Sequence, residues 1–273
     1  MTAVLGDFHT HSTLDDGGST LEEMAQAACA RGLTRLGFSG HSWCQWEEDF
    51  CLPRDQVPVY LETARALKER YRGKLDLFVG MELDYYGQRP EGLDYGIGSV
   101  HGLLLDGRFY PVDESPEKSR RAVEEQFGGD WYRYTDAYYD LVADLPQKTG
   151  CDWIGHFDLV TKFNQRLAAF DETAPRYLRR AMEVMEHLVK QSVAFELNTG
   201  AISRGYRTQP YPAMPLLRHL RRLGGELILS SDAHQAGHLC YGFDNGVEAA
   251  AQAGFDHVNV WTSAGFQAVG LSV

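Results

Sequence analysis

The sequence predicts an α/β fold built around a parallel sheet. Short apolar runs rich in Val, Ile, Leu and Phe recur along the 273 residues, with helical patterns between them. Both faces of these runs are apolar or small, which is typical of strands that helices cover on both sides. The alternation of strand and helix favours a parallel arrangement over a sandwich, and ~250 residues commonly form one α/β barrel.

Eight apolar runs are the predicted strands of this sheet. Each is short and is followed by a polar or glycine-containing segment, as expected where a strand ends. The predicted strands are residues 3–8, 35–39, 76–81, 95–100, 152–155, 193–197, 226–230 and 257–261.

Four helices are predicted between these strands. Ser19 and Glu22 have the spacing of a capping box, and the apolar face that follows them ends near Gly32. The other three helices are predicted at residues 55–71, 171–191 and 215–223, the last closed by Gly224 and Gly225.

Residues 102–150 interrupt this alternation of strands and helices, because they are too many for a simple crossover connection. They include a tyrosine-rich helix predicted at residues 130–145. We interpret the segment as an insertion over one end of the barrel, so that residues 1–273 form a single domain. Its aromatic residues and Trp43 could contact a substrate ring, but packing within the protein is the favoured role.

Composition excludes several classes of protein. The chain carries 26 Lys and Arg against 38 Asp and Glu, a formal charge of −12, and no basic stripe that would bind nucleic acid. No stretch approaches the ~20 apolar residues of a membrane helix, and no secretory signal is recognisable. Five cysteines without a close pair are expected to be reduced thiols, so a cytoplasmic location is predicted. The oligomeric state is not predicted.

The histidines fall at the carboxyl ends of the predicted strands. Two residues at i and i+2 on an extended strand share a face, and the ends of parallel strands converge where active sites are built. The residues placed in this way are His9 and His11, His41, Glu82, His101, His156, Asn198, and Asp232 with His234.

This placement predicts a metal site. A single strand-end histidine is more often a hydrogen-bonded core residue than a ligand, but six of the ten histidines follow the pattern. Histidine nitrogen and carboxylate oxygen are ligands for Zn²⁺, Mn²⁺ or Fe²⁺, and Glu82 could bridge two ions. The remaining four histidines are predicted to be surface or packing residues.

Three acidic residues near these histidines have open roles. Asp16 lies in a turn-forming loop and is either a turn residue or a further ligand or acid. Asp7 either orients a metal-bound histidine or ends its strand. Asp158 carries the same ambiguity.

At these residues the chain closely resembles the PHP (polymerase and histidinol phosphatase) superfamily. The motifs stand in the family's order and spacing, and the resemblance covers nearly the whole chain. Within the superfamily the chain is similar to the PHP-type histidinol phosphatases. The superfamily motifs are GDFHTHSTLDDG, GFSGHS, GMELDY, GSVHGL, GHFDL and SSDAH, and the branch motifs include YPVDESPE, WIGHFDLVTKF and ELNTGAISRGYRTQPYP.

The resemblance implies a distorted TIM-like (β/α)7 barrel with a trinuclear centre of Zn, Mn or Fe at the carboxyl ends of its strands. Some superfamily members have a histidine where this chain has Gly17, so Asp16 takes that role by resemblance to the phosphatase branch. The implied ligands are His9, His11, Glu82 and Asp232 for one ion, Glu82, His101 and His156 for a second, and Asp16, His41 and His234 for the third.

The implied reaction is hydrolysis of L-histidinol phosphate, a small phosphate monoester, by attack of a metal-bridging hydroxide on phosphorus. Thr161 stands where the branch often has an arginine, so other cationic residues would have to bind the phosphate. Arg204 is the first candidate, followed by Lys162 and Arg207. Asp16, His234 or water could protonate the leaving alkoxide.

Three other functions fit parts of this pattern. A PHP phosphoesterase acting on another monoester, a nucleotide or a nucleic-acid end would share the metal site, but this chain lacks a basic groove. A hydrolase of the amidohydrolase type usually needs a carboxylated lysine where this chain has Glu82. A metal-storage protein would bind ions and release no phosphate.

Overall fold

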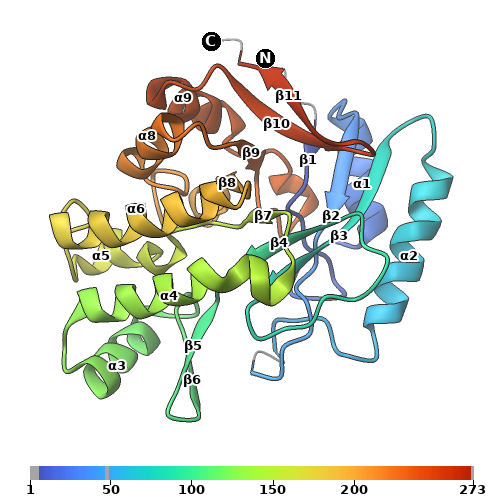
Figure 1. The fold of residues 1–273 in the computed structure, drawn as a ribbon. Helices are drawn as coiled ribbons and strands as arrows, with labels where there is room; N and C mark the ends of the chain where they lie inside the picture. The colour runs from blue at the N-terminus through green and yellow to red at the C-terminus, as the bar shows by residue number, and fades with distance from the viewer. Residues whose placement is uncertain (1–5, 47–48, 272–273) are drawn as a thin grey trace.

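The computed structural model describes residues 6–46 and 49–271. Its central feature is a curled sheet in the order β1-β2-β3-β4-β7-β8-β9-β10-β11, surrounded by helices (Figure 1). Neighbouring strands are parallel from β1 to β10, and only β11 runs antiparallel to its neighbour. The predicted parallel α/β class is therefore confirmed.

The strands match the predicted apolar runs, apart from residues 3–5, which lie outside the described residues. Three strands were not predicted: β5 and β6, which form a separate hairpin, and β11. The strands are β1 (Gly6–Asp7), β2 (Arg35–Phe38), β3 (Asp76–Asp84), β4 (Tyr95–Ser99), β5 (Gly102–Leu105), β6 (Arg108–Pro111), β7 (Trp153–Ile154), β8 (Ala194–Asn198), β9 (Leu227–Ser230), β10 (His257–Thr262) and β11 (Gly265–Gly270).

The predicted helices are present, and the structure adds α3, α9 and several short turns. The α-helices are α1 (Leu21–Ala30), α2 (Val57–Arg70), α3 (Pro116–Phe127), α4 (Trp131–Thr149), α5 (Asn164–Leu167), α6 (Pro175–Lys190), α7 (Gly200–Ser203), α8 (Met214–Arg222) and α9 (Phe243–Ala253). Two 3₁₀ turns, η1 (Leu159–Thr161) and η2 (Ala236–His238), complete the elements.

The start of α1 differs from the prediction by one residue. Thr20, and not Ser19, caps the helix: its side chain accepts a hydrogen bond from Glu23 N, and Glu23 Oε2 accepts one from Thr20 N at 2.8 Å. Both pairs have capping-box spacing, so the pattern alone could not distinguish them.

The two ends of the parallel sheet meet at the carboxyl ends of β1 and β9. His11 N donates to Ala233 O at 2.9 Å, and Ala233 N donates to His9 O at 3.1 Å. Thr10 and Ala233 form the corresponding parallel bridge. These bonds bring the segment after β9 beside the segment after β1.

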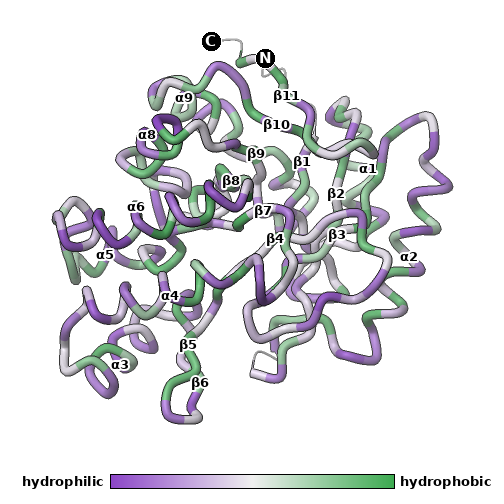
Figure 2. Tube along the Cα trace, in the orientation of Figure 1, coloured by the Kyte–Doolittle hydropathy of each residue, from purple (hydrophilic) through white to green (hydrophobic). Residues whose placement is uncertain are grey.

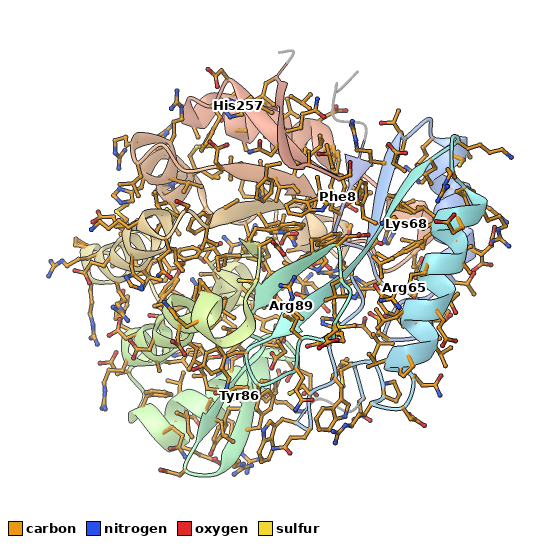
Figure 3. All side chains as sticks on the ribbon, turned by 45° about the vertical axis from the view of Figure 1, so that its right-hand side comes forward. Phe8, Arg65, Lys68, Tyr86, Arg89 and His257 are labelled. Atoms are coloured by element: carbon orange, nitrogen blue, oxygen red, sulfur yellow. The ribbon has the colours of Figure 1, made fainter. Side chains whose placement is uncertain are left out.

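Tyr95 fills part of the space inside the curled sheet. Its hydroxyl donates to Phe8 O at 2.7 Å and its ring stacks on Trp153 with centroids 4.7 Å apart. A Cβ on Gly37 or on Gly80 would lie 2.2 Å from Tyr95, so these glycines leave the room that the ring occupies. Figure 3 shows Phe8 at the centre of the molecule among these side chains.

The outer helices are amphipathic. The buried side of α2 consists of Tyr60, Leu61, Ala64 and Leu67, whereas its outer side is hydrophilic (Figure 2). From α2, Arg65 donates to Gly92 O at 3.2 Å and Lys68 pairs with Asp94 at 2.6 Å (Figure 3). These contacts fix the connection between β3 and β4.

The segment between β4 and β7 contains the β5–β6 hairpin, α3 and α4. Tyr134, Tyr138 and Tyr139 of α4 are buried in the larger core cluster, and α4 packs against α6. The aromatic face of this helix therefore packs inside the protein. Within the described residues, no helix is long and apolar enough to cross a membrane.

Candidate metal centre and pocket

The predicted metal-binding side chains converge at the carboxyl ends of the strands. Most follow their strands as predicted, but Glu82 lies within β3, because this strand continues to Asp84 rather than ending at Met81. His9, His11, His101, His156, Glu82 and Asp232 are each no more than 5% exposed.

Glu82 lies at the centre of this cluster. Its Oε2 is 3.2 Å from His9 Nε2 and 2.9 Å from His41 Nδ1. Its Oε1 is 2.8 Å from His156 Nε2 and 3.2 Å from His101 Nε2. With histidines on both oxygens, Glu82 has the position of a bridging carboxylate.

Asp232 and Asp16 occupy the other side of the cluster. Asp232 Oδ1 is 3.4 Å from both His11 Nε2 and His234 Nδ1. Asp16 Oδ2 is 3.3 Å from His234 Nε2, and Asp16 Oδ1 is 3.7 Å from His41 Nε2. The loop residue Asp16 thus lies among the strand-end histidines.

All nine predicted ligands belong to groups whose ligand atoms lie within 4.8 Å of one another. The groups overlap, so neighbouring ions could share residues. They are His11, Asp16, His41 and His234; His9, His156 and Asp232; His9, His11 and Glu82; and His41, Glu82 and His101.

Unpartnered buried nitrogens show that these residues fit a metal. A carboxylate only accepts hydrogen bonds, so His9 Nδ1 donates to Glu196 Oε1 at 2.6 Å and His11 Nδ1 donates to Asp15 Oδ2 at 2.7 Å. When each ring is neutral, its lone pair is therefore on Nε2, and both Nε2 atoms are buried without a hydrogen-bond partner. A buried polar atom left in this way is costly unless something binds it.

The carboxylates that orient the histidines were missed by the sequence reasoning. Besides Glu196 and Asp15, Asp84 Oδ2 lies 3.3 Å from His101 Nδ1. Glu196 also accepts from His156 N at 2.9 Å, so one buried carboxylate positions two histidines. Such carboxylate–histidine pairs fix the tautomer and ring direction of metal ligands.

Asp7 is the last residue of β1, which is one of the two roles considered for it. Its carboxylate accepts hydrogen bonds from Ser231 N at 3.1 Å, from the Ser231 hydroxyl and from Cys240 N at 2.9 Å. Asp7 therefore anchors the segment that leads to Asp232, and the orienting role on His9 belongs to Glu196.

The charges in the cluster shift the pKa values of its members. Burial would lower the pKa of His11, but the neighbouring carboxylates of Asp15 and Asp232 raise it to about 10. Burial would raise the pKa of Glu82, but His41, His9 and His101 bring it well below its usual value. The cluster therefore contains imidazoles that carry protons and carboxylates that carry negative charge. Divalent cations could displace the protons and bind both kinds of side chain.

Gly17 stands where some superfamily members have a histidine. A Cβ on this residue would lie 2.5 Å from Ser12 N and 2.7 Å from the carbonyl carbon of His11. No side chain fits there with this backbone, and the neighbouring Asp16 reaches the cluster instead.

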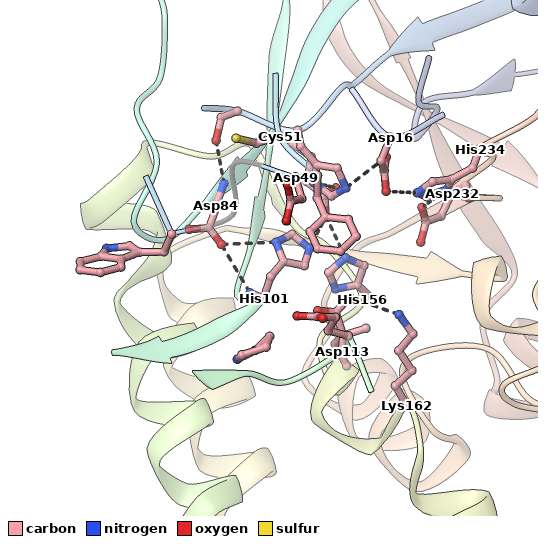
Figure 4. Close-up of a pocket in the computed structure, with 18 of the residues that line it drawn as sticks. Asp16, Asp49, Cys51, Asp84, His101, Asp113, His156, Lys162, Asp232 and His234 are labelled. Carbon is pink, nitrogen blue, oxygen red and sulfur yellow. Dashed lines mark hydrogen bonds and ion pairs between the residues drawn. The ribbon is translucent and has the colours of Figure 1, made fainter. Parts of the chain in front are cut away.

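Seven of the nine cluster residues, all except His9 and His11, form the floor of a pocket of about 490 Å³ (Figure 4). One wall comes from the β5–β6 hairpin and the turn after it, and another from the loop after His41. The wall side chains are both aromatic and acidic: Trp46, Phe50, Phe109, Tyr206, Asp49, Asp113 and Glu114.

Arg204 and Lys162 both line this pocket. Arg204 Nη2 is 2.8 Å from Asp232 Oδ2, and its Nη1 donates to Asp232 O at 2.9 Å. Lys162 Nζ is 3.2 Å from Asp113 Oδ2 and lies 5.0 Å from the ring centroid of Tyr206. The floor thus has a cation on each of two sides.

Arg207 is not among the residues that line the pocket. It pairs with Glu172 at 2.9 Å and donates to Thr161 O at 2.7 Å. Thr161 is fully buried, and its hydroxyl donates to Asp158 O at 2.7 Å. Arg207 and Thr161 therefore support the chain segment that carries Lys162.

Asp158 also helps to hold the chain segment that carries Lys162. Its Oδ2 accepts a hydrogen bond from Ala213 N at 3.0 Å, and burial raises its pKa to about 6. The Asp158 carboxylate thus bonds the backbone beyond β8 and not the metal-binding cluster.

Known proteins share this fold. Residues 7–200 match the model of the PHP domain family. A probable histidinol-phosphatase of Deinococcus radiodurans is 31% identical over 92% of this chain and 94% of its own length, and the histidinol-phosphatase of Bacillus subtilis is 24% identical over 87% and 96%. A similar fold is found in a crystal structure of histidinol phosphate phosphatase from Lactococcus lactis, complexed with zinc, L-histidinol and phosphate. Its sequence is 20% identical, the match covers 97% of this chain and 99% of that chain, and the TM-score is 0.71. The chain belongs to the PHP domain family, in its histidinol-phosphatase branch.

Proposed function

We propose that this protein is a metal-dependent phosphatase that hydrolyses L-histidinol phosphate to L-histidinol and phosphate. One observation carries the proposal: the metal-binding cluster at the base of the pocket contains buried histidine nitrogens with no hydrogen-bond partner, and two cations suited to a phosphate line the same pocket. The relatives named histidinol-phosphatase, which match nearly the whole chain, support the same substrate.

The nine cluster residues would hold three divalent ions, of zinc, manganese or iron. Nitrogen and carboxylate ligands suit all three metals. When bound, these ions would neutralise charge on the phosphate oxygens and lower the pKa of a water so that it can attack phosphorus. The resemblance assigns Asp232 to the ion of His9, His11 and Glu82, and His156 to the ion of Glu82 and His101. The geometry instead groups Asp232 and His156 together with His9.

Arg204 and Lys162 would bind the phosphate from two sides of the floor. The Arg204 guanidinium is held in place by Asp232, so its position does not have to be organised at the moment of reaction. Its planar donors suit the oxygens of a phosphate, and Lys162 supplies a second positive charge. Arg207 has no part in this site.

Water is the best proton source for the leaving alkoxide. Asp16 and His234 were the other candidates, and both line the pocket. A metal ligand must be deprotonated, so a residue that holds an ion cannot supply a proton at the same time. We therefore assign Asp16 and His234 to the metal centre.

The architecture fits a distorted (β/α)7 barrel with an insertion at about residues 102–150. The seven strands β1, β2, β3, β4, β7, β8 and β9 are parallel and follow each other in chain order, with β1 and β9 joined through Ala233. The inserted part would be the β5–β6 hairpin and α3, since α4 packs beside the sheet like a crossover helix. Residues 1–273 would then be one domain.

A phosphoesterase acting on nucleotides or nucleic-acid ends is the second candidate. Four carboxylates on the pocket walls, Asp49, Asp84, Asp113 and Glu114, disfavour a polyanion. They favour a small monoester that carries a positive charge of its own, as L-histidinol phosphate does.

A substrate panel tests the proposal. Phosphate release would be measured for the metal-loaded protein with L-histidinol phosphate, nucleoside monophosphates and single-stranded DNA. We expect the highest kcat/KM for L-histidinol phosphate. A higher value for a nucleotide or for DNA would overturn the proposed substrate, and no phosphate release at all would overturn the proposed reaction.

A further inference from the structure

We propose that Asp113 determines substrate selectivity by binding the ammonium group of the substrate beside the phosphate that Lys162 binds. This inference rests on the proposed phosphatase function and extends it to the leaving group. It assigns a role to the ion pair between Asp113 and Lys162 at the junction of the hairpin wall and the metal floor (Figure 4).

The ion pair spans two separate parts of the fold. Lys162 follows the 3₁₀ turn after His156 and belongs to the barrel side, whereas Asp113 follows β6 of the hairpin. Lys162 Nζ and Asp113 Oδ2 are 3.2 Å apart, and both side chains line the pocket. The side chains are 11% and 25% exposed, so the pair is shielded from water but open to the pocket.

The substrate carries the same two charges in a similar arrangement. In L-histidinol phosphate the amine is on the carbon next to the one that bears the phosphate ester. The ammonium and the phosphate are therefore separated by two carbons and one oxygen. When the phosphate lies against Lys162, the ammonium comes within reach of Asp113, and each charge of the protein pair acquires an opposite charge from the substrate.

Asp113 suits this role better than the other carboxylates of the pocket. The Asp84 carboxylate contacts His101 and accepts a hydrogen bond from Tyr86 N at 2.7 Å. Glu114 pairs with Lys118. Asp49 is exposed in the loop after His41. Asp113 is the carboxylate directly paired with the phosphate-binding lysine.

The same wall offers a surface for the imidazole ring. Phe109, on β6 and four residues before Asp113, faces Trp46 with ring centroids 6.4 Å apart and planes 8° from parallel. Both rings line the pocket. A planar ring joined through one methylene to the amine-bearing carbon would extend from Asp113 toward these aromatic side chains, where stacking is favourable.

The test compares two substrates that differ only in the amine. They are L-histidinol phosphate and its deamino analogue, 3-(imidazol-4-yl)propyl phosphate. Wild type, Asp113→Asn and the matched control Glu114→Gln would be loaded with metal, and kcat/KM would be measured for each pair. Thermal unfolding of each variant verifies that it is folded.

We expect wild type to prefer the amine-bearing substrate by ~10- to 100-fold, the range of one charge-assisted hydrogen bond in a shielded site. Asp113→Asn should remove most of that preference by lowering kcat/KM for L-histidinol phosphate, with the deamino analogue changed much less. Glu114→Gln should keep the preference of the wild type.

Equal losses on both substrates in Asp113→Asn would show that Asp113 only positions Lys162, and would overturn the inference. So would a wild type with no preference, or loss of the preference in Glu114→Gln instead. In each of these results the phosphatase function stands. Release of phosphate from neither substrate would overturn the proposed function, and this inference with it.

Discussion

The floor and the hairpin wall of the pocket are built differently. The floor is formed by residues of the proposed metal site, most of them no more than 5% exposed and several held by a second buried carboxylate. The hairpin wall, residues 109–118, carries side chains such as Asp113 and Glu114 that are 25% and 32% exposed. The proposed metal site thus lies at the strand ends, and the contacts proposed to select a leaving group lie on the separate hairpin and the turn after it.

This division explains how one metal floor can serve different substrates. Ligands at strand ends are fixed by the sheet, whereas a hairpin can change without disturbing it. If the division holds, changes in the floor should affect every substrate, and changes in the wall should affect only some.

Glu82→Ala should abolish the activity on every substrate. Glu82 contacts histidines through both oxygens, so its loss removes the proposed bridge and leaves buried cationic histidines unpaired. We expect kcat/KM to fall beyond ~10³-fold, more than after loss of one transition-state donor. Metal content, measured by elemental analysis, should fall with it, and an active Glu82→Ala enzyme would contradict the assigned floor.

Arg204→Ala should lower kcat/KM by ~10²-fold while the metal content is kept. Arg204 contacts Asp232 but is itself no metal ligand. The matched control is Arg207→Ala, because Arg207 lies outside the pocket and pairs with Glu172. This control should lose stability, by about 3 kcal/mol in denaturant unfolding, and keep its kinetics. Unchanged kinetics in Arg204→Ala would remove Arg204 from the site.

Glu196→Gln should weaken metal binding by ~10- to 100-fold. A glutamine keeps the size of the side chain but offers a weaker, uncharged acceptor to His9 Nδ1 and His156 N. Competition with a chelator measures the affinity, and excess metal should restore much of the activity. A loss of activity that excess metal does not restore would contradict a role in positioning the ligands.

Metal binding should release protons and become tighter as the pH rises. Asp15 and Asp232 raise the pKa of His11 to about 10 against the effect of burial, and neighbouring carboxylates likewise raise that of His9. These imidazoles are protonated at neutral pH and must lose the proton to bind an ion, so affinity rises up to about tenfold per pH unit for each proton displaced. Calorimetry in buffers of different ionisation enthalpy counts the protons, and zero would contradict this picture.

The sequence allowed the floor to be predicted better than the wall. His9, His41, His101 and His156 follow the ends of β1, β2, β4 and β7, and the chain order of parallel strands alone brings such residues together. Asp16 was ambiguous from spacing, and the resemblance decided its role. These predictions needed only local patterns.

The remaining features depend on tertiary contacts. Glu196 orients His9, which is 187 residues away along the chain, and no local pattern pairs them. Trp46 and Phe109 meet across the pocket from a loop and from the β5–β6 hairpin, which was not among the predicted strands. Asp7 ends β1, one of the two roles considered for it, but its bond to Ser231 could not be predicted because the curling of the sheet brings the two residues together.

The central claim is that the floor is a multinuclear metal centre that releases phosphate from L-histidinol phosphate. Its most direct test is elemental analysis of the purified protein, coupled to phosphate release by the same sample before and after chelation. We predict about three divalent ions per chain, loss of activity on chelation and recovery on adding metal back. Fewer than about two ions per chain in a fully active sample, or activity that survives complete removal of metal, would contradict this account.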